Sequence, residues 1–248
     1  PANPHDHFFK ALLSDEERAR DFVRHYLPPP VVGLLELSSL RREEGSFVDP
    51  QLQEVFTDLL FRVGLRDGQA AFVYLLFEHK SYPEFMTAYQ VLRYLVRIWE
   101  HTLRQEGRLC PVLPVVVYHG AIAWNVPERM HDLLSPPEEF GPFLPDYRYW
   151  LCDLTRYSDE EIKGATVLQA GLLALKYIFR PELRERLGDI FSLLADLAER
   201  RTGLEYLETL LRYLVAASGE LTAEDLREAL AEAMPEGENA MQTIADRW

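Results

Sequence analysis

The chain of 248 residues lacks several features that would assign it to a particular class of protein. It has no run near the roughly 18 apolar residues of a membrane helix, so we expect no membrane partner. We recognise no secretory leader, and the two cysteines, Cys110 and Cys152, lack the spacing of a metal or redox motif. These absences favour a reduced, cytoplasmic protein.

Basic residues are also scarce. The chain has 26 Lys and Arg against 40 Asp and Glu, a net charge of −14, which argues against a polyanionic partner. The deficit is uneven: residues 1–125 hold 13 basic against 16 acidic side chains, and residues 126–248 hold 13 against 24. If any part of the chain contacts a phosphate backbone, it is the first half.

Two kinds of hydrophobic pattern divide the chain near residue 155. The first part predicts a helix broken near Ser14, strands at 31–39, 55–63 and 72–79, a helix at 84–105 and a strand at 111–120. The second part predicts helices at 164–180, 182–200, 203–217 and 222–234. We therefore expect an α/β domain over residues 1–155, with the order helix, three strands, helix, strand, and an acidic helical extension over 156–248.

Charged side chains lie at the end of the third predicted strand, in VYLLFEHK. Side chains alternate between the two faces of a strand, so Glu78 and Lys80 share one face. Asp58 lies within the preceding strand, and a turn at Asp67-Gly68 makes the two strands antiparallel, which would place Asp58 beside Glu78. A buried, unpaired carboxylate needs a cation.

Two carboxylates and a lysine at one end of a sheet suit a Mg²⁺ ion that keeps some of its waters and leaves room for a phosphate oxygen. A lysine beside that ion can orient a water and stabilise charge on a phosphate in the transition state. These residues therefore indicate phosphodiester hydrolysis. The plainer interpretation of Glu78 and Lys80 alone is a surface ion pair, which contributes only about 0–1 kcal/mol.

The helix predicted after this strand has two stripes. Its polar stripe contains Gln90, Tyr94, Arg97, His101 and Arg104. Its mostly apolar stripe, which we expect to pack on the sheet, contains Val91, Leu95, Ile98 and Thr102. The polar stripe could hold the lysine, the water and the phosphate, although a Gln and a Tyr four residues apart are also ordinary on a half-exposed helix.

The pattern Asp58…Glu78-x-Lys80 followed by Gln90-x-x-x-Tyr94 resembles the PD-(D/E)xK nuclease superfamily in its RecB-like form. Thr57 stands where the pattern name has proline. The wider chain resembles the recombination-promoting nuclease family, also described as YhgA-like transposases. The segments that carry this resemblance are HDHFFKALLS, FTDLLFRV, YLLFEHKSYP, QVLRYLVRIWE, LPVVVYHG and LTRYSDEEI.

The resemblance implies a restriction-endonuclease-like core and a metal-dependent DNA endonuclease linked to recombination or mobile elements. The residues it implies as catalytic are Asp58, Glu78, Lys80, Gln90 and Tyr94. The metal ligands it implies are Asp58, Glu78, the backbone carbonyl of His79 and an acid from the first helix, for which Asp6 is the candidate. The expected cofactor is Mg²⁺, with Mn²⁺ as a substitute, and the expected partner is DNA.

Several residues and functions stay open at this point. A cap of the first helix is the favoured role of Asp6 over that of a metal ligand. Asp153 is assigned a structural role, and His119, at a predicted strand end, could touch substrate. The main alternative function is a catalytically silent DNA-binding or protein-interaction module of nuclease fold. The acidic extension suits a protein partner, a second copy of the chain, or a mask that restrains the first half of the chain. A true transposase fits less well, because that chemistry usually uses three carboxylates.

Overall fold

The computed structural model describes residues 3–43, 59–66, 72–195, 201–219 and 221–234. The chain divides into two compact units. We call Ser14–Thr155 the sheet unit and Pro1–Leu13 together with Arg156–Trp248 the helical unit. The first helix thus groups with the C-terminal helices in this division. The functional domains expected over 1–155 and 156–248 stay predictions.

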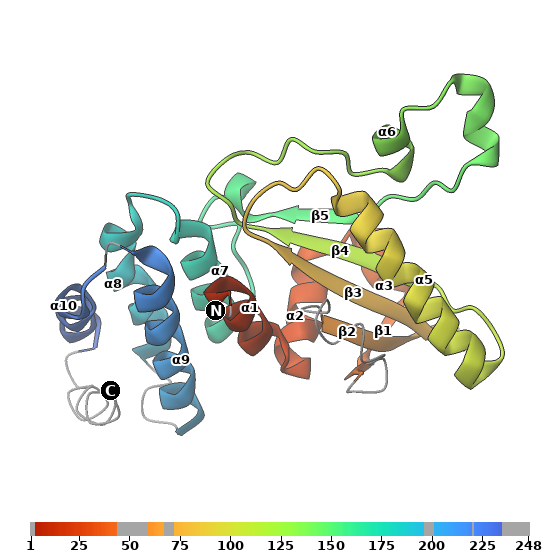
Figure 1. The fold of residues 1–248 in the computed structure, drawn as a ribbon. Coiled ribbons are helices and arrows are strands. Elements are labelled where there is room, and N and C mark those ends of the chain that lie inside the picture. The colour runs from red at the N-terminus through yellow and green to blue at the C-terminus, as the bar shows by residue number, and fades with distance from the viewer. Residues whose placement is uncertain (1–2, 44–58, 67–71, 196–200, 220, 235–248) are drawn as a thin grey trace. The chain divides into compact units, whose positions relative to one another are not determined.

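Within its described residues, the sheet unit contains a five-stranded sheet in the order β1-β2-β3-β4-β5 (Figure 1). The strands are β1 Leu35–Arg42, β2 Leu59–Leu65, β3 Phe72–Lys80, β4 Val112–Tyr118 and β5 Trp150–Asp153. Strands β1, β2 and β3 pair antiparallel, whereas β3, β4 and β5 pair parallel. The C-terminal ends of the three parallel strands therefore meet at one edge of the sheet. The α/β class is confirmed, and β5 is an addition that the sequence did not predict.

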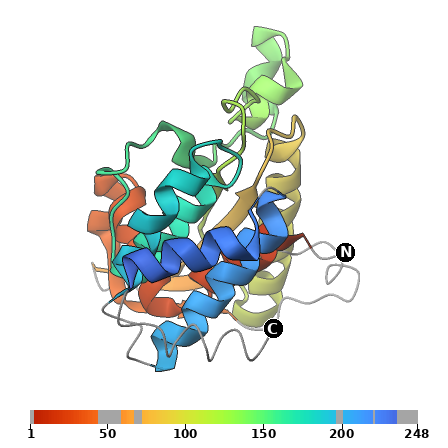
Figure 2. The ribbon, with the colours of Figure 1, turned by 90° about the vertical axis from the view of Figure 1, so that its left-hand side faces the viewer.

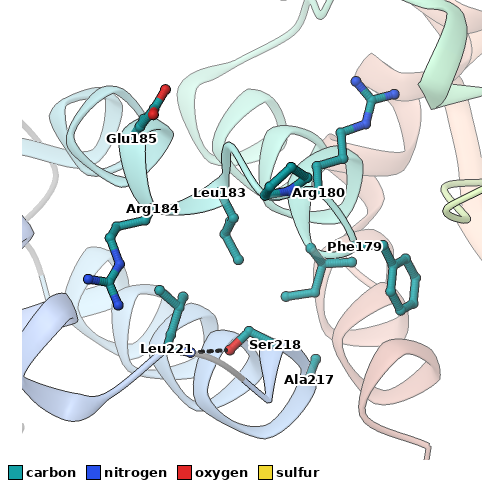
Figure 3. A pocket seen from close by; sticks show the side chains of 10 residues that line it. Phe179, Arg180, Leu183, Arg184, Glu185, Ala217, Ser218 and Leu221 are labelled. Carbon is teal, nitrogen blue, oxygen red and sulfur yellow. Dashed lines mark hydrogen bonds between the residues drawn. The ribbon is translucent and has the colours of Figure 1, made fainter.

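Two helices cover opposite faces of this sheet (Figure 2). The helices of the unit are α2 Glu16–Tyr26, α3 Pro29–Leu34, α5 Thr87–Glu106 and α6 Met130–Leu134, with short 3₁₀ segments at η1 Glu138–Phe143 and η2 Leu154–Arg156. Helix α2 packs against β3 through Phe22, whose ring lies 5.4 Å from that of Phe77. Helix α5 packs on the other face, where Val91 and Leu95 share a core cluster with Val116 of β4.

The ends of these helices follow from their sequences. Asp15, next to the predicted break at Ser14, caps α2 by accepting a hydrogen bond from the backbone N–H of Arg18 at 3.0 Å. The predicted apolar stripe of α5 is confirmed: each of its four residues is buried. Helix α5 ends at Gly107, whose φ of 68° is the left-handed conformation that glycine adopts readily.

The prediction of a strand over residues 31–39 is partly wrong. Residues 31–34 belong to α3, which begins at Pro29, and β1 begins only at Leu35 and continues to Arg42. Proline stops a preceding helix, but it is also well tolerated in the first turn of a new one, where its missing N–H has no partner to lose. The prolines at 28–30 therefore mark the start of a helix as well as the end of one.

The helical unit packs five helices within its described residues. They are α1 Pro4–Leu13, α7 Thr166–Tyr177, α8 Leu183–Leu194, α9 Arg201–Ser218 and α10 Ala223–Ala233. The rings of Phe8 and Tyr213 stack at 4.1 Å between α1 and α9. Gly171 allows α7 to approach closely, because a Cβ there would lie 2.6 Å from Leu12 of α1. Among the described helices, none combines the length and apolarity that a bilayer crossing requires.

Candidate active site

Strand β3 places Glu78 and Lys80 at the edge of the sheet where the parallel strands end. The two side chains share the face covered by α5, and Glu78 Oε1 lies 3.0 Å from Lys80 Nζ. Glu78 is only 4% exposed. The predicted shared face is thus confirmed, and because Glu78 is buried and the side chain of Lys80 is only 11% exposed, the two do not form a surface ion pair.

Two further residues contact Lys80. Glu84, in the connection after β3, places its Oε2 at 2.7 Å from Lys80 Nζ, and Lys80 donates to Gln90 Oε1 of α5 at 2.8 Å. The amide of Gln90 also donates to the other oxygen of Glu84. An ammonium has three N–H donors, and here each has an acceptor: Glu78, Glu84 or Gln90.

These contacts fix the charge state of Lys80. Burial by itself lowers the pKa of Lys80, but the charge of Glu78 and the hydrogen bonds to Glu84 and Glu78 outweigh it, so the pKa is raised above 10.5. Lys80 therefore stays protonated at neutral pH. It can donate hydrogen bonds and stabilise negative charge, but it is not suited to take a proton from water.

The cluster has more negative than positive charge. Two carboxylates, Glu78 and Glu84, face one ammonium, Lys80. The second oxygen of Glu78, Oε2, is buried and has no hydrogen-bond donor among the described residues. A buried carboxylate oxygen without a partner is costly, so this atom marks a place suited to a cation or a donor from outside the described chain. Glu78 thus has the chemistry of a metal ligand.

Asp58, the other predicted acid of the site, lies outside the described residues. The residue after it, Leu59, pairs with Phe77 of β3, the residue before Glu78. The sequence predicted that β2 and β3 pair antiparallel. This pairing is confirmed as far as Leu59 and Phe77. Within the described part of the chain, no three His, Cys, Asp or Glu side chains gather as a metal site.

The remaining predicted residues are distributed as follows. Tyr94 lies one turn after Gln90 and is 7% exposed, within the core cluster of α5 and β4. His79 lies in β3 between Glu78 and Lys80, and a ligand role for its carbonyl stays a prediction. Asp6 is in α1 of the helical unit, so its ligand role also stays a prediction.

The ends of β4 and β5 bring further side chains to the same edge of the sheet. His119 is fully buried, and its Nε2 lies 2.6 Å from Nε2 of His79, so one imidazole must donate and the other accept. Asp153 pairs in register with Tyr118 of β4, and its Oδ1 accepts from the backbone N–H and hydroxyl of Thr155. The sequence left Asp153 as a distant structural acid because β5 was not predicted.

Gly120 lets the chain leave β4 close to the end of β3. A Cβ at this position would lie 2.5 Å from the carbonyl oxygen of Ser81 and even closer to the hydroxyl of Tyr118. That hydroxyl is itself held by the carbonyl of Ile122. Glycine is therefore required for the close approach of the two strand ends.

Glu84 is a site residue that the sequence analysis did not predict. Its position four residues after Lys80, in a loop, was the available signal.

Comparisons with known proteins agree on one family. A profile of the family described as "Putative transposase, YhgA-like" matches residues 3–205. Recombination-promoting nuclease RpnD of Escherichia coli O157:H7 is 28% identical and RpnA of Escherichia coli K12 is 26% identical; the matches cover 99% of this chain and 94% and 83% of the relatives. The K12 protein named "Inactive recombination-promoting nuclease-like protein RpnE" is 29% identical over 99% of this chain and 81% of its own length. No solved structure matches significantly.

Proposed function

Because the chain belongs to the YhgA-like transposase family, we propose that it is a metal-dependent endonuclease that hydrolyses DNA phosphodiester bonds in recombination. The names of RpnD and RpnA as recombination-promoting nucleases support this proposal. Family membership alone does not decide activity, since RpnE is named inactive. The observation that carries the proposal is the buried, unpartnered Oε2 of Glu78 beside the protonated Lys80.

The proposed fold is a restriction-endonuclease-like core within residues 1–155, with 156–248 as a helical extension. The support is the order of elements, in which a helix precedes three antiparallel strands, a second helix and a parallel strand. In this fold each of two neighbouring strands carries an acid, and a lysine follows the second acid by two residues. All three side chains lie at one end of the sheet. We assign Asp58 as the partner of Glu78 because their neighbours, Leu59 and Phe77, are paired and we extend this register by one residue.

We assign Asp58 and Glu78 as ligands of Mg²⁺, with Mn²⁺ as a substitute and with the carbonyl of His79 and Asp6 as further ligand candidates. The excess negative charge and the free oxygen of Glu78 fit a hard divalent cation. When bound, such an ion would polarise a phosphate oxygen and lower the pKa of a water. Tyr94 would support the site from α5.

Lys80 would act as a donor. Its raised pKa keeps it charged, so it would hold the attacking water or a phosphate oxygen by a hydrogen bond and stabilise the charge that develops there. All three of its donors have acceptors in the structure, so contact with substrate requires it to exchange one of them. Glu84 and Gln90 would keep the ammonium close to its working position during that exchange.

DNA binding by a chain of net charge −14 requires local basic residues. The candidates are Arg41, Arg42, Arg62, Arg66 and Arg93. Arg41 and Arg62 are opposite each other on β1 and β2. Each also lies near a glutamate, at 3.6 Å from Glu16 and 3.7 Å from Glu106 respectively, so their charge is partly balanced.

Two further proposals concern the setting of the protein. Cys110 and Cys152 are both buried and form no disulfide with each other, which suits a reducing compartment, so we propose a cytoplasmic location. We also propose that the acidic helical extension provides the contact to a protein partner or to a second copy of the chain.

Incubation with supercoiled plasmid tests the proposed function. We expect nicking or linearisation with Mg²⁺ or Mn²⁺, none with EDTA, and none with Lys80→Ala or Asp58→Ala at equal folded concentration. If wild type and both variants are equally inert while a gel shift shows DNA binding, the chain is a silent binding module. One observation favours this second candidate function, a silent binding module: RpnE, which is similar to this chain, is named inactive.

A further inference from the structure

Large apolar side chains are exposed on the connection between β3 and α5 and on the first turn of α5, directly beside the candidate active site. Tyr82 is 61% exposed and Phe85 60%, and Met86 and Tyr89 are each 43% exposed. We call these four residues the aromatic cluster. The residue in their midst, Glu84, is the one whose carboxylate contacts Lys80.

The backbone that carries the aromatic cluster is held in place. The carboxylate of Glu84 contacts Lys80 and Gln90, and its carbonyl accepts from the backbone N–H of Thr87 at 3.0 Å and from the hydroxyl of Thr87 at 2.7 Å. The loop that carries Tyr82 and Phe85 is therefore fixed through Glu84, next to the buried charges. Exposed apolar side chains that gather beside a site usually mark a contact with a ligand or partner.

The composition of the cluster points to the kind of ligand. Three of its four members are aromatic, and aromatic rings offer flat faces for stacking on nucleobases. Phe85 comes just before α5, Tyr89 lies in the first turn of the helix, and Arg93 follows Tyr89 one turn later on the exposed side of the helix. Rings followed by a guanidinium suit a nucleic-acid strand, whose bases stack and whose phosphates are anionic.

We propose that Tyr82, Phe85 and Tyr89 stack on unpaired bases next to the cleaved phosphate, and that the site therefore prefers DNA with single-stranded segments. This inference rests on the proposed function. The faces of bases are covered inside a duplex, and only a strand that is unpaired or extruded presents them to an aromatic ring. Arg93 would bind a phosphate of the same strand.

Binding without cleavage tests this inference. The full-length protein in EDTA is titrated with a fluorescent single-stranded oligonucleotide and with the duplex of the same sequence, and anisotropy reports binding. We expect Phe85→Ala and Tyr89→Ala each to weaken single-strand binding by about fivefold or more, and to change duplex binding by less than about twofold. Tyr89→Phe, which keeps the ring, should restore single-strand binding.

Leu109→Ala is the matched control. Leu109 is 60% exposed, like Phe85, but it lies beyond the opposite end of α5, about 30 Å along a helix of 20 residues. It should change neither affinity. Arg93→Ala should weaken DNA binding. It should also make the plot of log binding constant against log salt concentration less steep, by about one unit of slope.

Three results would overturn the inference. Equal losses on both forms of DNA would mean that the rings act on the duplex, for example as a wedge between base pairs. If no ring variant loses affinity for single-stranded DNA, the aromatic cluster does not bind bases and contacts another kind of partner, such as a protein. Absence of binding to either form also contradicts it, and if metal-dependent plasmid cleavage is then still observed, the proposed function survives without this inference.

Discussion

Each unit of the molecule contains a largely buried lysine, and the two lysines have different partners. In the helical unit, Lys176 is 4% exposed and pairs with Asp159. In the sheet unit, the side chain of Lys80 is 11% exposed and is shared by Glu78 and Glu84. One lysine thus faces a single carboxylate and the other faces two.

The surroundings of the carboxylates complete the comparison. Both oxygens of Asp159 accept from the hydroxyl of Tyr177, and Arg186 lies 3.8 Å away, so the charge of this acid is fully balanced. In contrast, Glu78 keeps a buried oxygen without a donor among the described residues. The first arrangement is that of an ion pair that stabilises the fold. The second leaves an unsatisfied buried carboxylate oxygen, which is costly unless a cation or a donor binds there. The comparison therefore separates a structural ion pair from a site.

The largest expected effect comes from replacing each lysine by methionine. Lys80→Met should reduce DNA cleavage per folded molecule by at least about 100-fold, because the donor to the phosphate or water is lost. Lys176→Met should leave cleavage per folded molecule unchanged but lower the free energy of unfolding by about 1–3 kcal/mol, since Asp159 loses its charged partner on α7 and keeps only Tyr177 and the more distant Arg186. Plasmid cleavage and chemical denaturation followed by circular dichroism measure the two effects. A comparable loss of cleavage in both variants would contradict the comparison.

Neutralising each acid gives the next largest contrast, this time in stability alone. Asp159→Asn should lower the free energy of unfolding by about 3–5 kcal/mol, because a buried Lys176 loses its counter-charge. Glu78→Gln should leave stability unchanged or raise it slightly in the absence of divalent ions, because it removes the excess negative charge. Thermal unfolding in EDTA reports both. If Glu78→Gln destabilises as much as Asp159→Asn, the cluster around Lys80 is a structural ion pair.

A smaller effect is expected from Glu84, which is closer to the surface. Glu84→Gln keeps the shape of the side chain but removes one charged contact to Lys80, so cleavage should fall by about tenfold, in line with the loss of one charge-assisted hydrogen bond. Glu100→Gln is the matched control on α5, since Glu100 forms only an exposed pair with Arg97 at 3.0 Å. An equal and small change in both would show that Glu84 does not position the lysine.

The smallest expected effect is on the stability of the protein at low pH. Burial by itself raises the pKa of Asp159, but the hydrogen bonds from Lys176 and Tyr177 outweigh it, so the pKa lies below its ordinary 3.8. A group with a lowered folded-state pKa stabilises the fold above its unfolded pKa, and that stability is lost as the pH falls through the folded value. Below about pH 3.8 the wild type should therefore lose stability more steeply than Asp159→Asn. Thermal unfolding at a series of pH values would show the difference; parallel curves would contradict it.

Much of the fold was predictable because its signals are local. The apolar stripe of α5, the strand that ends at Lys80 and the helices α7 to α10 all follow from periodicity, and the structure matches them within a few residues at most ends. β5 was missed because a strand of four residues directly after a proline-rich connection carries too little pattern to separate it from a loop. The helix at Pro29 was missed because proline both ends and begins helices.

The candidate site was predictable only in part. The shared face of Glu78 and Lys80 follows from the alternation of side chains along a strand. The contacts of Glu84 and the pairing of His79 with His119 depend on how a loop and a neighbouring strand return to the site, which no local pattern records. Tertiary contacts of this kind require the whole sheet. Asp58 stays a prediction.

The central claim is that the excess negative charge around Lys80 binds a divalent cation. Calorimetric titration of Mg²⁺ into wild type, Glu78→Gln and Glu100→Gln tests it most directly, because it needs neither DNA nor cleavage. We predict the same affinity for wild type and Glu100→Gln, and a loss of at least about tenfold, or 1.4 kcal/mol, for Glu78→Gln. Equal binding by all three proteins, or no binding by wild type, would contradict the claim.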